Sequence, residues 1–300
     1  AEWLRLAKQT GLWLRESGTV VLARAEDEFA VLEDFGAERG EDVVLLDRGE
    51  VAARVPVGED VIGGAWLPRD LRVYPRDASA AIASWLESQG VRVHWKTSML
   101  GLQGTTVRTT RGDMHGSRVV VCVGHDVDYL FPAVAEAHGV RRCLLHMLRV
   151  NAPAGRTIDP AVLTGFSLLR YDGFGVSPAL ASVRERLTLT QGGSIEAGLN
   201  LMYTQRPDGE LTVGDTHDYG ADAVPFHDEE RDELVLRQMS ALLGVSSLRV
   251  RERWQGVYAS APEPFLIAEP SPETRIVSVT TGIGMTTGLG LAAEVLDDLL

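Results

Sequence analysis

Residues 275–300 read R-I-V-S-V-T-T-G-I-G-M-T-T-G-L-G-L-A-A-E-V-L-D-D-L-L, and this stretch decides the fold. Its first part, Ile276 to Val279, is rich in β-branched residues and predicts a short buried strand. A helical spacing of apolar residues, from Leu289 to Leu299, closes the chain. Between the two lie Gly282, Gly284, Gly288 and Gly290. The stretch therefore predicts a strand, a glycine-rich turn and a helix.

The glycine turn has two interpretations. Glycines let the backbone come close to a ligand, and the free N–H groups and positive dipole at a helix start favour an anion or a carbonyl oxygen. Alternatively, the glycines serve only to pack the helix tightly on the strand. The turn alone leaves both interpretations open.

Size and charge narrow the classes of function. The chain has 300 residues, of which 45% are hydrophobic, enough for one large domain or two intermediate ones. It lacks an apolar run long enough to cross a bilayer, and its first residues show no signal-peptide pattern, so we expect a cytoplasmic protein. A net charge of -13 argues against nucleic acids and anionic membranes as partners. The oligomeric state is not written in the sequence.

The two cysteines, Cys122 and Cys143, both lie in apolar runs. Two isolated cysteines make neither a disulfide framework nor a metal site, so we interpret them as buried thiols. The sequence shows no metal-ligand spacing and no catalytic triad.

Periodicity predicts an α/β chain with a change of texture near residue 141. Helices are expected at residues 26–39, 77–89 and 228–243, with strands at 19–23, 43–46 and 91–95 and a hairpin over 105–115. The apolar run at 119–123 is typical of a central parallel strand buried on both faces, with Gly124 at its carboxyl end. Longer strands follow, predicted at residues 143–150, 164–170, 199–205, 211–215 and 248–258.

Several motifs resemble one family. The segments R-W-Q-G-V-Y-A-S-A-P-E at 253–263 and T-G-I-G-M-T at 281–286 are similar to those of FAD-dependent amine and amino-acid oxidoreductases of the D-amino-acid oxidase, glycine oxidase and sarcosine oxidase type. The resemblance covers most of the chain. It implies an FAD-binding, Rossmann-like three-layer domain at residues 1–140 and 251–300, with an inserted, mainly antiparallel β-sheet substrate domain at 141–250. Further segments, R-V-Y-P-R-D, R-R-C-L-L-H-M and V-G-D-T-H-D-Y, look most like a branch proposed to act in aminophosphonate catabolism.

The resemblance implies a set of FAD contacts. The glycine turn matches the segment whose backbone N–H groups meet the pyrimidine edge of the flavin, which decides between its two interpretations. Met99 matches a position near the adenine, while Val123 and Gly124 match a strand end near the ribose and pyrophosphate. The residues of the glycine turn that match are Gly282, Ile283, Gly284, Met285 and Thr286.

The chain departs from the family pattern in four places. The family opens with a Gly-x-Gly-x-x-Gly strand-turn-helix unit, and none precedes Ala1, so we expect that the first βαβ unit is missing and that the fold is N-terminally truncated. Tyr258 stands where glycine oxidases have an arginine for the substrate carboxylate, and Thr286 where sarcosine oxidases have a lysine. Gly256 stands where sarcosine oxidases have a cysteine bonded to the flavin, which implies non-covalent FAD.

The implied activity is oxidation of a small primary or secondary amine, by oxidative deamination or demethylation with hydride transfer to flavin N5, and an aminophosphonate is one candidate substrate. The cofactor carries the chemistry, and the protein orients and desolvates the substrate. Tyr258 and His146 are the candidate catalytic residues. Candidate substrate contacts on or beside the strands expected to line the cavity are Tyr258, His146, Arg170, Tyr203 and His217.

Two alternatives remain open. One is a flavin-dependent 2-hydroxy-acid dehydrogenase coupled to a nicotinamide or quinone, which fits the loss of the carboxylate arginine equally well. The other is a non-catalytic remnant that binds no cofactor, which the missing N-terminal unit favours.

Overall fold

A nine-stranded sheet dominates the computed structural model, which describes residues 2–153, 156–220 and 226–300. Its path is β14-β10-β13-β12-β11-β2-β4-β3, and β15 pairs with the other edge of β10. The strands are β2 (Thr19–Ala23), β3 (Val44–Asp47), β4 (Gly63–Leu67), β10 (Arg141–Val150), β11 (Ala161–Leu163), β12 (Met202–Gln205), β13 (Leu211–Gly214), β14 (His217–Gly220) and β15 (Val250–Ser260). Strands from both sides of residue 140 thus share one sheet, because β11 pairs in parallel with β2. The three predicted domain ranges stay a prediction.

Smaller sheets form the other part of the molecule. One contains β16 (Phe265–Ser271), β17 (Thr274–Val279) and β9 (Val119–Val121), with β9 parallel to β17. The prediction that the run at 119–123 is a central strand buried on both faces is wrong: β9 lies at the sheet edge and Val120 is 38% exposed. The predicted hairpin is confirmed by a second sheet of β6 (Met99–Gln103), β7 (Thr106–Thr109) and β8 (Gly112–His115). β1 (Leu14–Arg15) and β5 (Arg72–Val73) pair by themselves.

The helices that periodicity predicted are confirmed as α2 (Glu26–Arg39), α4 (Pro75–Ser88), α9 (Glu229–Leu242) and α10 (Gly284–Leu299). The others are α1 (Glu2–Thr10), α3 (Arg48–Arg54), α5 (Val127–Leu130), α6 (Pro132–Ala137), α7 (Gly165–Arg170) and α8 (Leu180–Glu196).

Two predicted strands are absent. Residues 164–170, expected as a strand, form α7, because the Ser167 N–H donates to the Thr164 carbonyl at 2.8 Å and Ser167 Oγ accepts from the Thr164 N–H at 3.3 Å at the start of the helix. Residues 91–95, also expected as a strand, form a loop on the surface. Their alternation of apolar and polar residues has no partner strand to pair with in the described chain.

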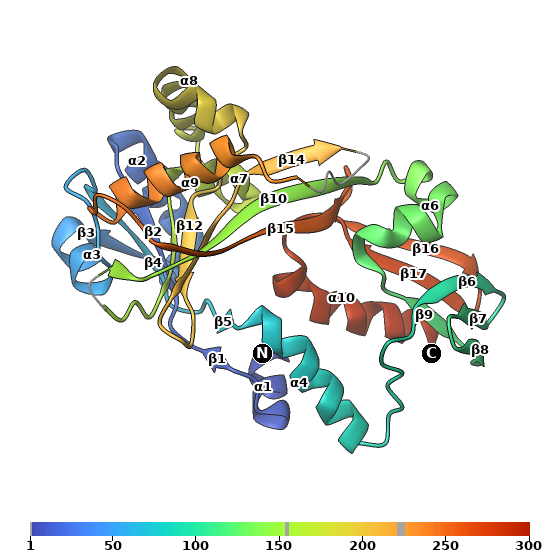
Figure 1. The fold of residues 1–300 in the computed structure, drawn as a ribbon. Helices are drawn as coiled ribbons and strands as arrows, with labels where there is room; N and C mark the ends of the chain where they lie inside the picture. The colour runs from blue at the N-terminus through green and yellow to red at the C-terminus, as the bar shows by residue number, and fades with distance from the viewer. Residues whose placement is uncertain (1, 154–155, 221–225) are drawn as a thin grey trace.

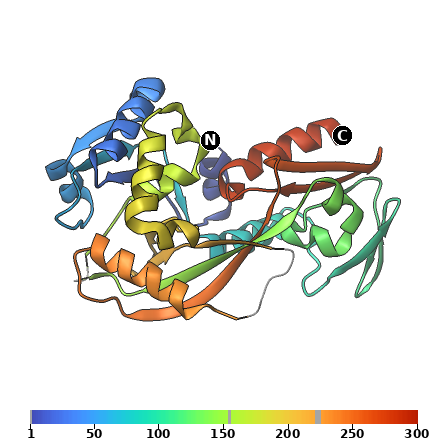
Figure 2. The same ribbon diagram turned by 90° about the horizontal axis from the view of Figure 1, so that it is seen from above.

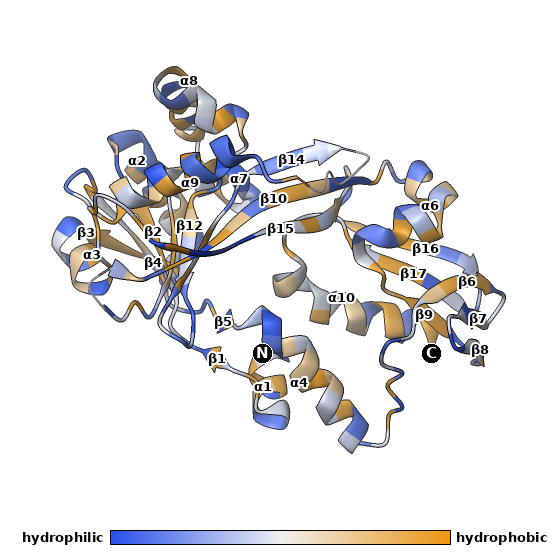
Figure 3. Cartoon of the chain, viewed as in Figure 1, coloured by the Kyte–Doolittle hydropathy of each residue, from blue (hydrophilic) through white to orange (hydrophobic). Residues whose placement is uncertain are grey.

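The hydrophobic core consists of separate clusters, one at the nine-stranded sheet and two at the smaller sheets. The larger cluster fills both sides of the nine-stranded sheet under α2, α8 and α9, with β2 buried along its whole length. Against Val277 of β17, α10 packs Leu291 and Val295, and the buried Leu299 continues their helical i, i+4, i+8 spacing. In Figure 3 α9 is mostly hydrophilic, and its first turn carries the exposed Glu229 and Glu230.

Strands β10 and β15 join the two parts. They pair over their whole length and run from the large sheet toward the smaller sheets, where α10 lies (Figure 1). Seen from above, α10 lies at the opposite end of the molecule from α2 and α3 (Figure 2). None of the described helices is both long and apolar enough to span a membrane.

Candidate functional site

One face of the central strands lines a large cavity. Side chains alternate along β10, so Leu145 and Met147 point to one face of the sheet and their neighbours to the other. Across the pairing, Gly256 and Trp254 of β15 lie opposite Leu145 and Met147 and share their face. The cavity measures about 770 Å³, within the usual range for a small-molecule site. Its other walls are Met202 on β12, the start of α10, and the segment around Trp3, Trp13 and residues 69–76.

The start of α10 closes one edge of this cavity. Met285 and Thr286 line it, and Trp3 Nε1 donates a hydrogen bond of 2.7 Å to the Met285 carbonyl. The first N–H groups of a helix have no intrahelical partner, so this end offers donors and a positive dipole. A side chain at Gly282 would lie only 3.7 Å from the Tyr258 ring and 3.9 Å from the Arg170 guanidinium. The glycine turn is therefore held directly against the sheet.

A cationic cluster adjoins the turn; we call Arg170, Tyr219 and Tyr258 the Arg170 cluster. Arg170, the last residue of α7, donates to the Tyr258 hydroxyl and, at 3.0 Å, to the Tyr219 hydroxyl. Tyr219 and Tyr258 flank Cys143 on the same face of the sheet, since each pairs with it in register. Burial raises the pKa of the Tyr258 phenol, so Tyr258 stays protonated at neutral pH. The cluster thus presents a cation and two hydroxyl groups.

Asp215 and His217 lie next to this cluster. His217 is buried, its ring meets the Tyr258 ring edge-on at 6.4 Å, and its Nδ1 lies 3.0 Å from the Gly198 carbonyl oxygen. Burial, with the charge of Arg170, lowers the pKa of His217 to about 4. Burial raises the pKa of Asp215 to about 7, and the charge of Arg170 opposes this rise. The pKa values of these two neighbouring groups are thus shifted in opposite directions, as the pKa values of groups at functional sites often are.

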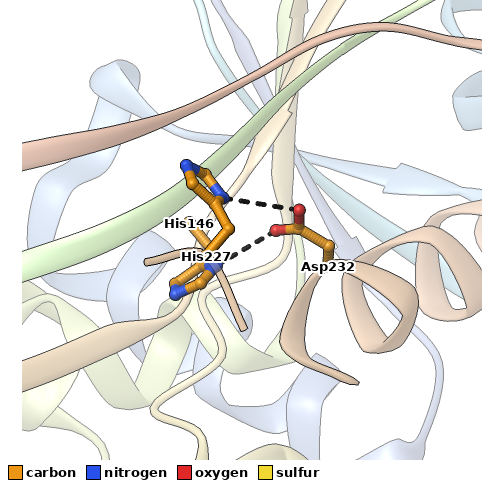
Figure 4. A group of neighbouring side chains, drawn as sticks. All are labelled: His146, His227 and Asp232. Atoms are coloured by element: carbon orange, nitrogen blue, oxygen red, sulfur yellow. Dashed lines mark hydrogen bonds and ion pairs between the residues drawn. The ribbon is translucent and has the colours of Figure 1, made fainter. Parts of the chain in front are cut away.

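Two of the predicted site residues lie on the opposite face of the sheet. Tyr203, predicted to contact substrate, is 1% exposed and sits in the large core. His146, predicted to be catalytic, faces α9 and bonds Asp232 at 3.1 Å (Figure 4). None of the five predicted substrate contacts lines the cavity: His146 and Tyr203 lie across the sheet from it, whereas Arg170, Tyr258 and His217 lie together beside the glycine turn.

The group in Figure 4 also bears on metal binding. His146, His227 and Asp232 place their ligand atoms within 4.8 Å of one another. However, Arg253 Nε lies 2.9 Å from Asp232 Oδ2, so a fixed cation already compensates this carboxylate. We interpret the group as a network that ties α9 to β10 and β15.

The remaining predicted FAD contacts lie along the smaller sheets. Met99 on β6 packs against the core that Val121 and Val123 border. Gly124 has a positive φ of 59° and ends the run after β9. Its carbonyl accepts a hydrogen bond of 3.4 Å from Ser278 Oγ on β17, the strand that leads into the glycine turn. Val123, Gly124 and the glycine turn thus follow neighbouring strands of one sheet, whereas Met99 lies on β6 of the separate hairpin sheet.

Four residues of the site were not among the predicted contacts. Leu145 and Trp254 line the cavity, Tyr219 belongs to the Arg170 cluster, and Asp215 lies beside it. A signal for two of them was present: in V-G-D-T-H-D-Y the residues Asp215, His217 and Tyr219 alternate with period two, as side chains on one face of a strand do.

The cavity fits the ring of a flavin. Leu145, Met147 and Trp254 give it an apolar wall, and Gly256 lets the Leu145 side chain pack close to the β15 backbone, because a Cβ there would lie 3.3 Å from that side chain. The free N–H groups at the start of α10 would meet the polar edge of such a ring, where reduction would place negative charge. Glycines in the turn allow this approach without steric hindrance.

Comparison with solved structures shows the same fold. Glycine oxidase from Geobacillus kaustophilus is similar with a TM-score of 0.73 and 20% identity, covering 96% of this chain and 74% of that chain. Iminodiacetate oxidase from Chelativorans sp. BNC1 is similar with a TM-score of 0.71 and 17% identity, covering 96% of this chain and 73% of that chain. L-α-glycerophosphate oxidase from Mycoplasma pneumoniae, which has FAD bound, is similar with a TM-score of 0.74 and 17% identity, covering 99% of this chain and 76% of that chain.

The family is shown by sequence. No curated protein matches the chain at a significant level. The sequence profile of the family described as "DAO: FAD dependent oxidoreductase" matches residues 1–298, nearly the whole chain. The chain therefore belongs to the DAO family of FAD-dependent oxidoreductases, and FAD is its cofactor.

Proposed function

We propose that the protein oxidises a small primary or secondary amine that also carries an anionic acid group, with an aminophosphonate as the leading candidate. The observation that supports this is the Arg170 cluster beside the glycine turn, where a guanidinium and two tyrosine hydroxyls meet. Guanidinium groups bind carboxylates and phosphonates through paired charge-assisted hydrogen bonds. A neutral amine would not require such a cluster.

The position of Arg170 accounts for the missing arginine on β15. Tyr258 stands where similar glycine oxidases have the arginine that binds the substrate carboxylate, and the Arg170 guanidinium touches the Tyr258 hydroxyl. The Arg170 guanidinium thus lies beside Tyr258, but it comes from the end of α7 instead of from β15. Because it arrives at a different angle and with two hydroxyl groups, we expect the acid group of the substrate to differ from that of an ordinary α-amino acid.

The other residues around the cavity would bind FAD and orient the substrate against it. Bound FAD supplies the electron acceptor for the oxidation of the carbon beside the amine. Leu145, Met147 and Trp254 exclude water from the cavity, which strengthens electrostatic interactions inside it. Gly256 offers no thiol, so we propose that FAD is held without a covalent bond.

Absorbance of the purified protein tests the flavin part. Flavin bands that a denaturant releases into solution would support non-covalent FAD. The measurement should be made on this chain and on its whole reading frame, since about a quarter of each solved chain lies outside the match. The predicted absence of the N-terminal unit stays a prediction until then. No flavin in either sample would contradict the proposal.

Arg170→Met tests the acid anchor. We expect this variant to raise the KM for 2-aminoethylphosphonate by about 10- to 100-fold, because a hydrogen bond to a charged group contributes about 1.5–3 kcal/mol. Arg184→Met is the matched control, since Arg184 is an exposed arginine on α8. The substrate panel includes carboxylate amines, amines without an acid group and 2-hydroxy acids. Preference for a 2-hydroxy acid, or an unchanged KM in Arg170→Met, would reject the proposal.

A further inference from the structure

A second cavity adjoins the large one. It measures about 540 Å³, and five residues line both cavities and so form the wall between them. These residues are Trp13, Arg72, Gln205, Arg206 and Pro207. The proposed function makes no use of this second cavity, whose lining is mainly polar and charged.

The charges around the second cavity do not balance. Its lining contains the arginines Arg15, Arg72, Arg156 and Arg206 and the acids Asp159, Asp208 and Glu210. Arg206 pairs with Asp208 at 3.1 Å, and Glu210 is held by Arg149 and, at 3.2 Å, by Arg251, which both lie outside the lining. Among the residues that the structure describes, Arg15, Arg72, Arg156 and Asp159 form no ion pair. Three cations thus face one carboxylate, an excess of two positive charges.

Two of the unpaired cations lie directly opposite each other. Arg15 of β1 pairs in register with Arg72 of β5, so the two side chains project from the same face of this antiparallel ribbon. Both guanidinium groups lie beside the Trp13 ring, at 5.9 Å and 5.4 Å from its centroid. Like charges in such a pair repel and destabilise the strands. An anion held beside both would replace this repulsion by attraction.

Arg72 is fixed in the wall between the cavities. It is 8% exposed, and its guanidinium donates to the backbone carbonyls of Ile158, Asp159 and Gln205. These acceptors are neutral, so they satisfy hydrogen bonds but leave the charge uncompensated. Burial lowers the pKa of Arg72, the charge of Asp159 opposes this effect, and the charge of Arg15 adds to it. Arginine nevertheless stays protonated, so a fixed cation faces the cavity.

We infer that the second cavity binds a small oxyanion with two negative charges, of the phosphate or phosphonate type. Arg15, Arg72 and Arg156 supply the donors, since guanidinium groups match the geometry of such anions. The excess of two positive charges favours a dianion over a simple carboxylate. The whole chain carries a net charge of -13, so a cationic cavity is a local exception that concentrates anions from solution.

The anion has two possible sources with the same chemistry. One is free inorganic phosphate, and the other is the phosphonate group of a substrate that approaches the large cavity past Arg72. The inference that a dianion binds here does not depend on the proposed function. Only the second source does.

Calorimetric titration with inorganic phosphate at pH 8 tests the site. We expect Arg15→Gln and Arg156→Gln each to weaken phosphate binding about tenfold, because each removes a charge-assisted contact. Both arginines are exposed, so their loss should leave the fold intact, which far-UV circular dichroism checks. Arg184→Gln removes an exposed arginine from α8, outside the cavity lining, and should bind phosphate like the wild type. Acetate, a monoanion, should bind the wild type more weakly than phosphate.

The titration is repeated with excess FAD, so that the pyrophosphate of the cofactor cannot be the anion that occupies the site. Loss of phosphate binding in the presence of FAD would reject the inference. So would absence of phosphate binding in the wild type, or equal binding by the wild type and the Arg15→Gln and Arg156→Gln variants. Equal binding of acetate and phosphate would overturn the assignment to a dianion.

Saturating 2-aminoethylphosphonate then separates the two sources. If it abolishes phosphate binding at the site that Arg156→Gln weakens, the cavity receives the phosphonate group of the substrate. If phosphate binds as before, the cavity holds free phosphate. Failure of the proposed function would leave the phosphate titration and its response to Arg15→Gln unchanged, so the two proposals can fail separately.

Discussion

Two aspartates of this protein are buried in opposite ways. Asp232, 0% exposed, lies on the α9 side of the sheet and is surrounded by His146 at 3.1 Å, His227 at 3.5 Å and Arg253 at 2.9 Å. The Arg253 contact is an ion pair rather than an aligned hydrogen bond. Asp215, on the side of the Arg170 cluster, has one oxygen with no partner. The first carboxylate is compensated by ion pairs, whereas the second has only the more distant charge of Arg170 and a hydrogen bond from the Asn200 side chain. A buried charge is therefore better judged by its partners than by its burial.

The largest expected effect is on the compensated aspartate. Asp232→Asn removes the charge that Arg253, His146 and His227 surround, and removing one partner of a buried pair should lower the free energy of unfolding by about 3 kcal/mol. Urea denaturation at pH 7 measures this loss. Glu233→Gln, an exposed neighbour on α9, is the control and should change stability by less than about 0.5 kcal/mol. A loss no larger than that of the control would contradict a structural role for the network.

The uncompensated aspartate should behave in the opposite way. The pKa of Asp215 is raised to about 7 from 3.8, so the folded state binds its proton more tightly than the unfolded chain does. This group therefore lowers stability as pH rises from about 4 to 7. Asp215→Asn should be more stable than the wild type at pH 8 by about 1–2 kcal/mol, with the difference vanishing near pH 4. A variant that is less stable at pH 8 would show that the carboxylate is compensated after all.

The sequence predicted the helices of this fold better than it predicted the pairing and orientation of the strands. The spacing of apolar residues and the glycine stops predicted α2, α4, α9 and α10, because helix periodicity is local. The pairing of β11 with β2 joins segments about 140 residues apart, and no local pattern carries that information. Likewise, both faces of β10 carry apolar side chains, Leu144 and Leu148 on one and Leu145 and Met147 on the other, so the sequence does not reveal which side meets the cavity. His146 was expected on the cavity side because its strand was expected to line the cavity, and the missing partner of Asp215 Oδ1 could be seen only in three dimensions.

The smallest expected effect concerns His217. Its pKa is lowered to about 4 from 6.5, so between these values the unfolded chain binds more protons and stability rises with pH. The His217→Asn variant lacks this contribution of the histidine to the pH dependence of stability. Its stability relative to the wild type should therefore be about 1 kcal/mol more favourable at pH 4.5 than at pH 7. Comparing the two pH values cancels the packing lost with the ring. A difference of the opposite sign would mean that His217 is protonated in the folded protein, paired with Asp215.

The tryptophans of the cavity wall give the protein a built-in optical reporter. Trp3, Trp13 and Trp254, half of the six tryptophans in the chain, line the cavity. Trp3 is also tied to the start of α10 through the Met285 carbonyl. Indole emission overlaps the near-ultraviolet absorption of flavins, so a flavin in this cavity should quench much of the intrinsic fluorescence by energy transfer. Release of the cofactor should restore that emission, which makes occupancy measurable in the native protein without a label.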